Sequence, residues 1–238
     1  MKVRNYQPVL SLRPTQFSIG LIEVEYKVLE LRKMGEEERA RCVQKTRIPV
    51  VVSPWRELYI VDHHHYLFAC WHADIPQARV EVVDDLSASG LSYKQFWRRM
   101  VQHRQAYLYD QFGEGPREPL YLPPDIRGLA DDPYRSLAWL VRKEGGYDNS
   151  SESFAEFRWA DYFRARKLLV SHGREGFHDA VRKGLRLARL PAAQDLPGFH
   201  GKRKKLIEVA KIEEAFKKSK YVPKHRSKGE MATLAVVG

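Results

Sequence analysis

The sequence predicts an α+β fold: a small mixed sheet with helices, then a helical subdomain and a basic C-terminal helix. Three observations support this. Short β-branched segments alternate with segments of helical spacing over residues 7–90. From 91 to 190, apolar residues recur at helical spacing. Within the last part, 191–238, residues 201–228 hold eleven Lys and Arg against three Glu, which is +8 of the chain's net charge of +11. We therefore divide the chain into these three parts.

The first segments predict one strand and two helices. Residues 8–12 form a brief apolar strand that ends before Pro14. After Gly20, Leu21 and the apolar residues that follow it recur at helical spacing up to Leu31. A second helix begins with three glutamates at 36–38, and an acidic first turn suits the helix dipole.

Three further strands and one helix complete the predicted sheet domain. The β-branched run 48–52 and the apolar run 58–61 are strands joined by the loop 53–57. Asp62 is a suitable N-cap for a helix that includes Leu67 and Phe68. The alternating segment 79–84 is the last strand.

The middle of the chain is predominantly helical. A helix begins after Ser92 and presents aromatic residues on one face. Four prolines and two glycines in 113–124 predict an irregular loop. Three more helices are predicted, over 132–145, around 154–163 and over 175–190. Residues 191–201 then read as a linker to a basic amphipathic helix, which the pattern places at 202–220.

The composition places the protein in the cytoplasm and predicts no membrane span. Only Cys42 and Cys70 occur, too few for a disulfide framework. No run reaches the roughly 18–20 apolar residues of a membrane helix. The first residues lack the apolar core of a signal peptide. The sequence does not indicate an oligomeric state.

The most distinctive motif is Asp62-His63-His64-His65, at a predicted strand-to-helix turn. Such a turn offers unpaired backbone N–H groups and the positive end of the helix dipole, where proteins hold phosphate. Successive helical residues point about 100° apart, so at most two of the histidines converge on one ligand. A purely structural cluster remains an alternative. Metal ligands on helices usually stand at i and i+4, which this run lacks, so we predict no metal site.

Other charged residues are candidates for the same site. Glu23 is a candidate general base facing the phosphate turn, with Lys27 beside it to contact phosphate. The alternative is an ordinary i, i+4 ion pair between these two residues. Arg135 would contact phosphate if the helical part folds over the turn; otherwise it forms structural ion pairs in its own helix region.

Several short stretches of the first 85 residues form a recognisable set: Leu12-Arg13-Pro14-Thr15-Gln16, Gly20, Glu23, Lys27, Ile48-Pro49-Val50-Val51-Val52 and Ile60-Val61-Asp62-His63-His64-His65. Through them this part resembles the ParB/sulfiredoxin-like superfamily. Two later stretches are Asp132-Pro133-Tyr134-Arg135-Ser136-Leu137-Ala138 and Phe157-Arg158-Trp159-Ala160-Asp161. With these and the DHHH run, the resemblance extends over about residues 7–190 to the group of ParB-like nucleases.

The resemblance implies a nucleotide site at the strand-to-helix turn. Members of the superfamily include chromosome-partitioning CTPases, sulfiredoxins that use ATP, and kinases of free serine. Their turn often carries Gly-x-x-Arg or Gly-x-His-Arg. Here the matching positions are His63 to Tyr66, so the motif's glycine and arginine are absent. This removes a flexible residue and a permanent cation from the site.

We predict that a nucleoside phosphate or another phosphate group binds at Asp62–Tyr66, through His63, His64, His65, Lys27 and Arg135. Phosphoryl transfer or hydrolysis would use Glu23, Asp62, His64 and His65, with Mg²⁺ and ATP, ADP or CTP. The alternatives are a catalytically silent scaffold and a DNA-binding protein or ParB-like nuclease. In the DNA-acting alternative the basic tail contacts DNA, with Lys202, Arg203, Lys204 and Lys205.

Overall fold

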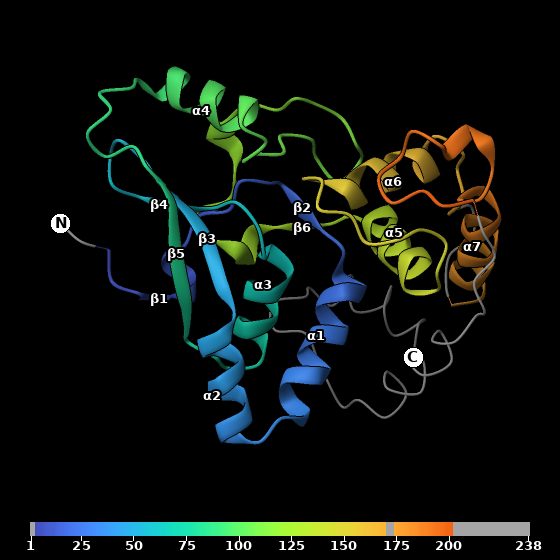
Figure 1. Ribbon diagram of the computed structural model, residues 1–238, viewed down its shortest axis with the longest axis horizontal. Coiled ribbons are helices and arrows are strands. Elements are labelled where there is room, and N and C mark those ends of the chain that lie inside the picture. Colours follow the sequence, from blue (N-terminus) through green and yellow to red (C-terminus); the bar gives the residue numbers. More distant parts are fainter. Residues whose placement is uncertain (1–2, 170–173, 202–238) are drawn as a thin grey trace. The chain divides into compact units, whose positions relative to one another are not determined.

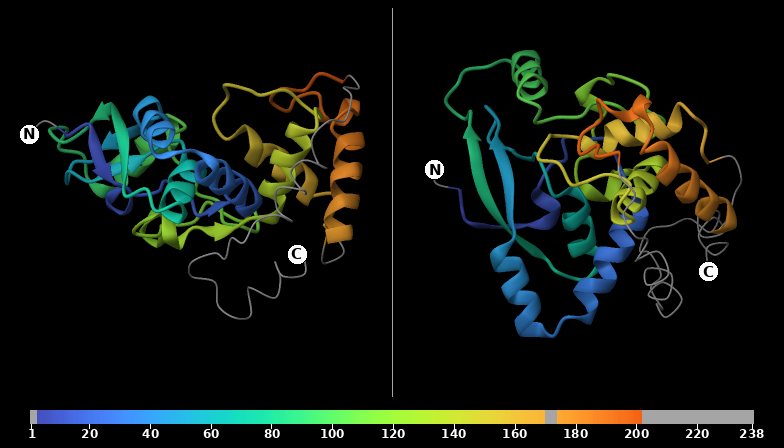
Figure 2. Two further views of the ribbon diagram at one scale, coloured as in Figure 1. Left: turned by 90° about the horizontal axis from the view of Figure 1, so that it is seen from below. Right: turned by 45° about the vertical axis from the view of Figure 1, so that its right-hand side comes forward.

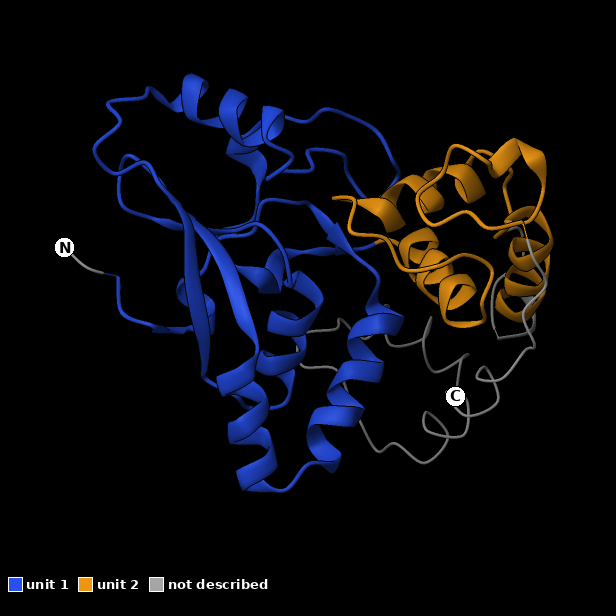
Figure 3. Ribbon diagram, in the orientation of Figure 1, with its two compact units in different colours: residues 1–131 blue, residues 132–238 orange. Residues whose placement is uncertain are grey.

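The computed structural model describes residues 3–169 and 174–201, and the chain divides into two compact units (Figure 3). Unit 1 comprises residues 1–131 and unit 2 residues 132–238. The sequence placed a boundary at residue 90. In the structure, residues 91–131 belong to the same unit as the sheet. The predicted tail helix and its four candidate DNA contacts lie outside the described residues.

Unit 1 is built on a four-stranded mixed sheet in the order β1-β5-β3-β4 (Figure 1). The strands are β1 (Tyr6–Pro8), β3 (Arg47–Val52), β4 (Leu58–Ile60) and β5 (Gln77–Asp85). The central strands β3 and β5 are parallel, and each outer strand is antiparallel to its neighbour. Val50 and Val51 of β3 are fully buried, as expected of a β-branched run in the middle of a sheet.

Three helices of unit 1 lie between these strands in the sequence, two before β3 and one between β4 and β5. They are α1 (Leu21–Lys33), α2 (Glu36–Lys45) and α3 (His64–His72). The buried residues Val24, Val28 and Leu31 give α1 the apolar face that its spacing predicted, and α1 packs against α3. This packing brings the first turns of the two helices together.

The structure corrects two sequence predictions in this unit. Residues Val9–Ser11 form a short 3₁₀ helix, and the strand predicted there lies earlier, at β1. The predicted N-cap Asp62 stands one residue too early, because α3 is capped by His63. The sequence also missed a short parallel pair, β2 (Ser18–Ile19) with β6 (Ala130–Asp131).

The helix α4 (Tyr93–Gln102) lies beyond the carboxyl ends of β3 and β5, away from α1–α3 (Figures 1 and 2). Ser92 and Gln95 form a capping box at its start. Phe96, Trp97 and Met100 of α4 pack into an aromatic cluster with Tyr59 of β4. The loop after α4 is mostly irregular and contains the 3₁₀ turns η2 (Pro119–Tyr121) and η3 (Ile126–Gly128).

Unit 2 is helical, with α5 (Pro133–Lys143), α6 (Ala155–Arg164), α7 (Arg174–Leu187) and the 3₁₀ turn η4 (Pro191–Ala193). Tyr147 stacks on Trp159 with ring centroids 4.1 Å apart, and both are buried. The Trp159 indole N–H donates to the carbonyl of Pro197 at 2.8 Å. The segment read as a linker therefore packs on the helices as far as Pro197.

The predicted α+β class is confirmed, and so is the order of a mixed sheet followed by helices. Among the described residues, none of the helices is long and apolar enough to cross a membrane.

Candidate functional site

The turn from β4 into α3 has an open helix end. His63 is the N-cap, and its side chain makes no capping hydrogen bond to the first turn. The N–H groups of the first turn have no partner within a helix, so they carry the positive end of the dipole. Asp62 Oδ1 accepts the His63 N–H at 2.6 Å and braces the turn. The arrangement suits an anion.

His63 has a strained backbone conformation. Its φ is 65° and its ψ 22°, in the left-handed region that glycine adopts at little cost. The resemblance places His63 where the superfamily motif has its glycine, a residue that adopts this conformation more readily than histidine. Both His63 and Asp62 are exposed. They are the accessible side chains of the predicted DHHH site.

His64 points into the core. Only 3% of the residue is exposed, and its Nε2 accepts the N–H of Thr15 at 3.1 Å. Burial, together with the charges of His65 and His63, lowers the pKa of His64 well below 6.5. A neutral ring that accepts at Nε2 carries its proton on Nδ1. His64 therefore ties the segment around Thr15 to the turn, and it does not supply a positive charge to a phosphate.

His65 connects α3 to the first turn of α1. Its Nε2 accepts the N–H of Gly20 at 3.0 Å and lies 3.7 Å from Glu23 Oε2. Glu23 is buried, and its Oε1 lies 3.4 Å from Nζ of the partly exposed Lys27. The structure thus brings together Glu23, Lys27 and His65 at the side of the α3 turn. It also contains the i, i+4 ion pair that was the alternative explanation.

The remaining predicted residue, Arg135, lies on α5 in unit 2. It is buried, with its Nη2 3.8 Å from Glu156 Oε2 and its guanidinium carbon 5.6 Å from the ring centroid of Phe157. Arg142 contacts the same glutamate at 3.0 Å. These contacts are the ion pairs expected in the alternative interpretation. A role for Arg135 in phosphate binding stays a prediction.

The backbone N–H groups of Thr15 and Gly20 were not recognised as part of this region. Each donates to a histidine that lies 49 or 45 residues away in the sequence. The residues occur in the stretch that carries the family resemblance, but no local pattern pairs them with particular rings. Only the folded chain assigns these partners.

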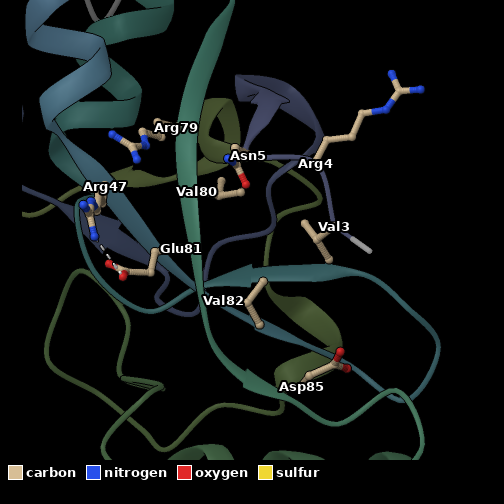
Figure 4. Close-up of a pocket in the computed structure, with 9 residues that line it drawn as sticks. All are labelled: Val3, Arg4, Asn5, Arg47, Arg79, Val80, Glu81, Val82 and Asp85. Atoms are coloured by element: carbon tan, nitrogen blue, oxygen red, sulfur yellow. Dashed lines mark hydrogen bonds and ion pairs between the residues drawn. The ribbon is translucent and has the colours of Figure 1, made fainter. Parts of the chain in front are cut away.

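A pocket of about 410 Å³ lies elsewhere in unit 1, beside the β1, β5 and β3 strands (Figure 4). Two of its lining arginines make hydrogen bonds. Arg47 Nη1 donates to Glu81 Oε1 at 3.2 Å, and Arg79 Nη1 donates to the carbonyl of Gln44 at 2.7 Å. None of the predicted site residues lines this pocket. Its lining consists of Val3, Arg4, Asn5, Arg47, Arg79, Val80, Glu81, Val82 and Asp85. In the part of the chain that the structure describes, no group of three or more His, Cys, Asp or Glu is placed to hold a metal.

Comparisons with known proteins support the family resemblance. The model of a family described as "Putative ParB-like nuclease" matches residues 6–165. The crystal structure of protein Atu1540 from Agrobacterium tumefaciens is similar, with 33% sequence identity and a TM-score of 0.72. The match covers 83% of this chain and 96% of that chain. A comparison with curated proteins gives no match.

Proposed function

The chain belongs to this ParB-like nuclease family, and we propose that it binds a phosphate-bearing ligand, a nucleoside phosphate, at the N-terminal turn of α3. The observation that carries the proposal is the open helix end with His63 held in a left-handed conformation. Strain of this kind costs about 1–3 kcal/mol, and it concentrates at ligand sites. At this turn, the residue with the strained backbone is the N-cap, and its side chain does not cap the N–H groups of the first turn.

Few cations support the anion at this turn. A helix N-terminus alone contributes about 0.3–1 kcal/mol. His64 is neutral and buried, so among the described residues Lys27 is the side chain that we propose to supply positive charge at this turn. This positive charge is small compared with the negative charge of a triphosphate. Mg²⁺ bound with the nucleotide would offset much of the remaining charge.

Glu23 is the residue that we propose for proton transfer if the bound phosphate reacts. Its carboxylate is buried beside His65 and Lys27. A carboxylate held in this way could accept a proton from an attacking hydroxyl or water. In this proposal Lys27 positions Glu23 through their 3.4 Å ion pair, and His64 holds the turn in place. Asp62 orients His63.

Calorimetry with the full chain tests the proposal. ATP, ADP, CTP and inorganic phosphate are titrated with and without Mg²⁺. We expect Lys27→Gln to weaken nucleotide binding about fivefold to tenfold, because it removes a cation near the turn. Lys33→Gln is the matched control, since Lys33 lies on the same helix and also pairs with a glutamate one turn earlier. It should leave affinity unchanged within twofold.

The outcome distinguishes ligand classes. Binding of all three nucleotides and of phosphate at similar strength would indicate a phosphate site without base recognition. No heat with any of them would reject the proposal. His64→Ala is a poor test, because it would leave the Thr15 N–H without its acceptor and would alter the fold around the turn.

A second candidate function is action on DNA, which the description of the family favours. In this proposal the tail lysines and arginine bind DNA phosphates, and Glu23 and Asp62 take part in cleavage. The test replaces Lys202, Arg203, Lys204 and Lys205 by glutamine in the full chain, because shortening it to Ala193 would remove the packing of Pro197 on Trp159. Unchanged gel shifts would contradict a role of the tail in DNA binding. Plasmid nicking that is unaffected by Glu23→Gln would contradict a role of Glu23 in cleavage.

A further inference from the structure

An aromatic pair is exposed on unit 1, at residues outside the histidine run. Trp55, in the loop between β3 and β4, stacks on Tyr93, the first residue of α4. Their ring centroids lie 5.6 Å apart at an interplanar angle of 24°, and the residues are 37% and 44% exposed. The pair presents aromatic surface to water.

The pair is firmly held. The Trp55 indole N–H donates to Glu57 Oε2 at 2.6 Å, and the Tyr59 hydroxyl donates to the same oxygen at 2.8 Å. The other oxygen of Glu57 forms an ion pair with Arg13 at 2.5 Å. Trp55 also contacts the buried Phe96 edge-on, with centroids 5.0 Å apart. Rings fixed in this way lose little conformational entropy when a ligand stacks on them.

Three cationic residues lie close to the pair in the sequence. Arg56 follows Trp55, and Lys94 and Arg98 lie one helical turn apart on α4; all three are exposed. Within the described residues, none of the three takes part in an ion pair. The helix α4 itself contains no Asp or Glu. Glu118 and Glu57, which Arg13 pairs, are acidic residues near Tyr93, and Asp85 is an acidic residue near Arg56.

We propose that this surface, defined by Trp55, Arg56, Tyr93, Lys94 and Arg98, binds single-stranded nucleic acid. One base stacks on the aromatic pair, and the neighbouring phosphates contact the three cations. Stacking on an exposed aromatic residue tolerates every base, since each has a π face. In a duplex those faces are covered by adjacent base pairs, so the aromatic rings favour a single strand.

The proposed surface shares no residue with the α3 turn or with the basic tail. The inference therefore does not rest on the phosphate proposal. It also predicts a feature that a basic tail alone would not produce, namely that the bases contribute to affinity. A test must separate this contribution from charge.

Fluorescence anisotropy of a labelled 12-nucleotide dT strand with the full chain measures the stacking. We expect Trp55→Ala and Tyr93→Ala each to weaken binding about tenfold. Tyr93→Phe should bind like the wild type. Tyr121→Ala is the control, because Tyr121 is 73% exposed in the same unit but lies outside the proposed surface. An abasic 12-nucleotide strand should bind the wild type about tenfold more weakly than dT.

The salt dependence of dT binding measures the cations. Replacing both Lys94 and Arg98 by glutamine should reduce the slope of log K against log salt by about 1.4, for two single-strand phosphate contacts. The double variant Arg41→Gln, Lys45→Gln on α2 is the control and should leave the slope unchanged. A strand of rU in place of dT shows whether the sugar matters, and duplex DNA should show no effect of Tyr93→Ala.

The tail is present in every variant, so its contribution is common to all measurements. Equal binding of dT by wild type, Trp55→Ala and Tyr93→Ala would overturn the proposal, as would equal binding of dT and the abasic strand. No binding by the wild type would also overturn it. If Trp55→Ala lowers the melting temperature, the binding measured with Tyr93→Ala decides the test. Tyr93 is exposed at the start of a helix, so its replacement should disturb the fold less.

Discussion

The two units contain helix starts that look alike in the sequence and differ in the structure. In unit 2, Asp132 caps α5: its Oδ1 accepts from the N–H groups of Tyr134 and Arg135, and its Oδ2 pairs with Arg164 at 2.6 Å. In unit 1, Asp62 precedes the cap of α3 and accepts the N–H of the cap residue His63, but the side chain of His63 makes no capping hydrogen bond to the first turn. One helix end is closed and the other is open.

The two helices differ in whether the aspartate occupies the N-cap or stands one residue before it. At the N-cap the aspartate closes the first turn of α5, whereas the first turn of α3 remains a candidate binding site. Pro133 follows Asp132 and fixes the φ of the first helical position, so the aspartate becomes the cap. After Asp62 comes His63, which adopts the left-handed conformation and takes the cap position itself. A helix whose own side chains do not satisfy its first N–H groups leaves them for water or a ligand.

The largest expected effect distinguishes the two aspartates by stability. Asp132→Ala should destabilise unit 2 by about 2–3 kcal/mol, because the cap is lost and Arg164 loses a buried partner. Asp62→Ala, at an exposed residue outside the cap position, should cost less than about 1 kcal/mol. Urea unfolding at pH 7 measures both. Equal losses in the free energy of unfolding would mean that both aspartates contribute alike to helix capping.

A second prediction concerns the inner side of the α3 turn. Because burial, His65 and His63 lower the pKa of His64, the unfolded chain takes up a proton below about pH 6.5 that the folded chain does not. Stability should therefore fall as the pH falls below 6.5, by up to about 1.4 kcal/mol per pH unit for this group. His64→Gln should show a shallower fall in urea unfolding between pH 7.5 and 5. Parallel curves for the two proteins would contradict this.

The smallest expected effect concerns His63. His63→Gly removes the left-handed strain but increases the freedom of the unfolded chain, so the free energy of unfolding should change by less than about 1 kcal/mol. Asp74→Gly, at another residue of positive φ, is the matched control. Thermal melting checks both variants. A large loss at His63 alone would show that its side chain, rather than its backbone conformation, holds the turn.

The periodicity of the sequence determined which segments became helices and strands. Val24, Val28 and Leu31 are buried on α1, and the β-branched run became the central strand β3. The departures arose where a segment is short: Val9–Ser11 is a 3₁₀ helix, and the two-residue strands β2 and β6 pair across the chain. Segments this short depend on their partners more than on their own pattern.

The sequence by itself determined the α+β class, the histidine run at a strand-to-helix turn and the spacing that places Glu23 beside Lys27. Only the tertiary structure decided that two rings of the run turn inward to accept N–H groups of Thr15 and Gly20, and that His63 stays outside. The physical reason is the range of the interactions. Periodicity and capping act between neighbours in the chain, whereas the burial of an imidazole is set by partners more than forty residues away.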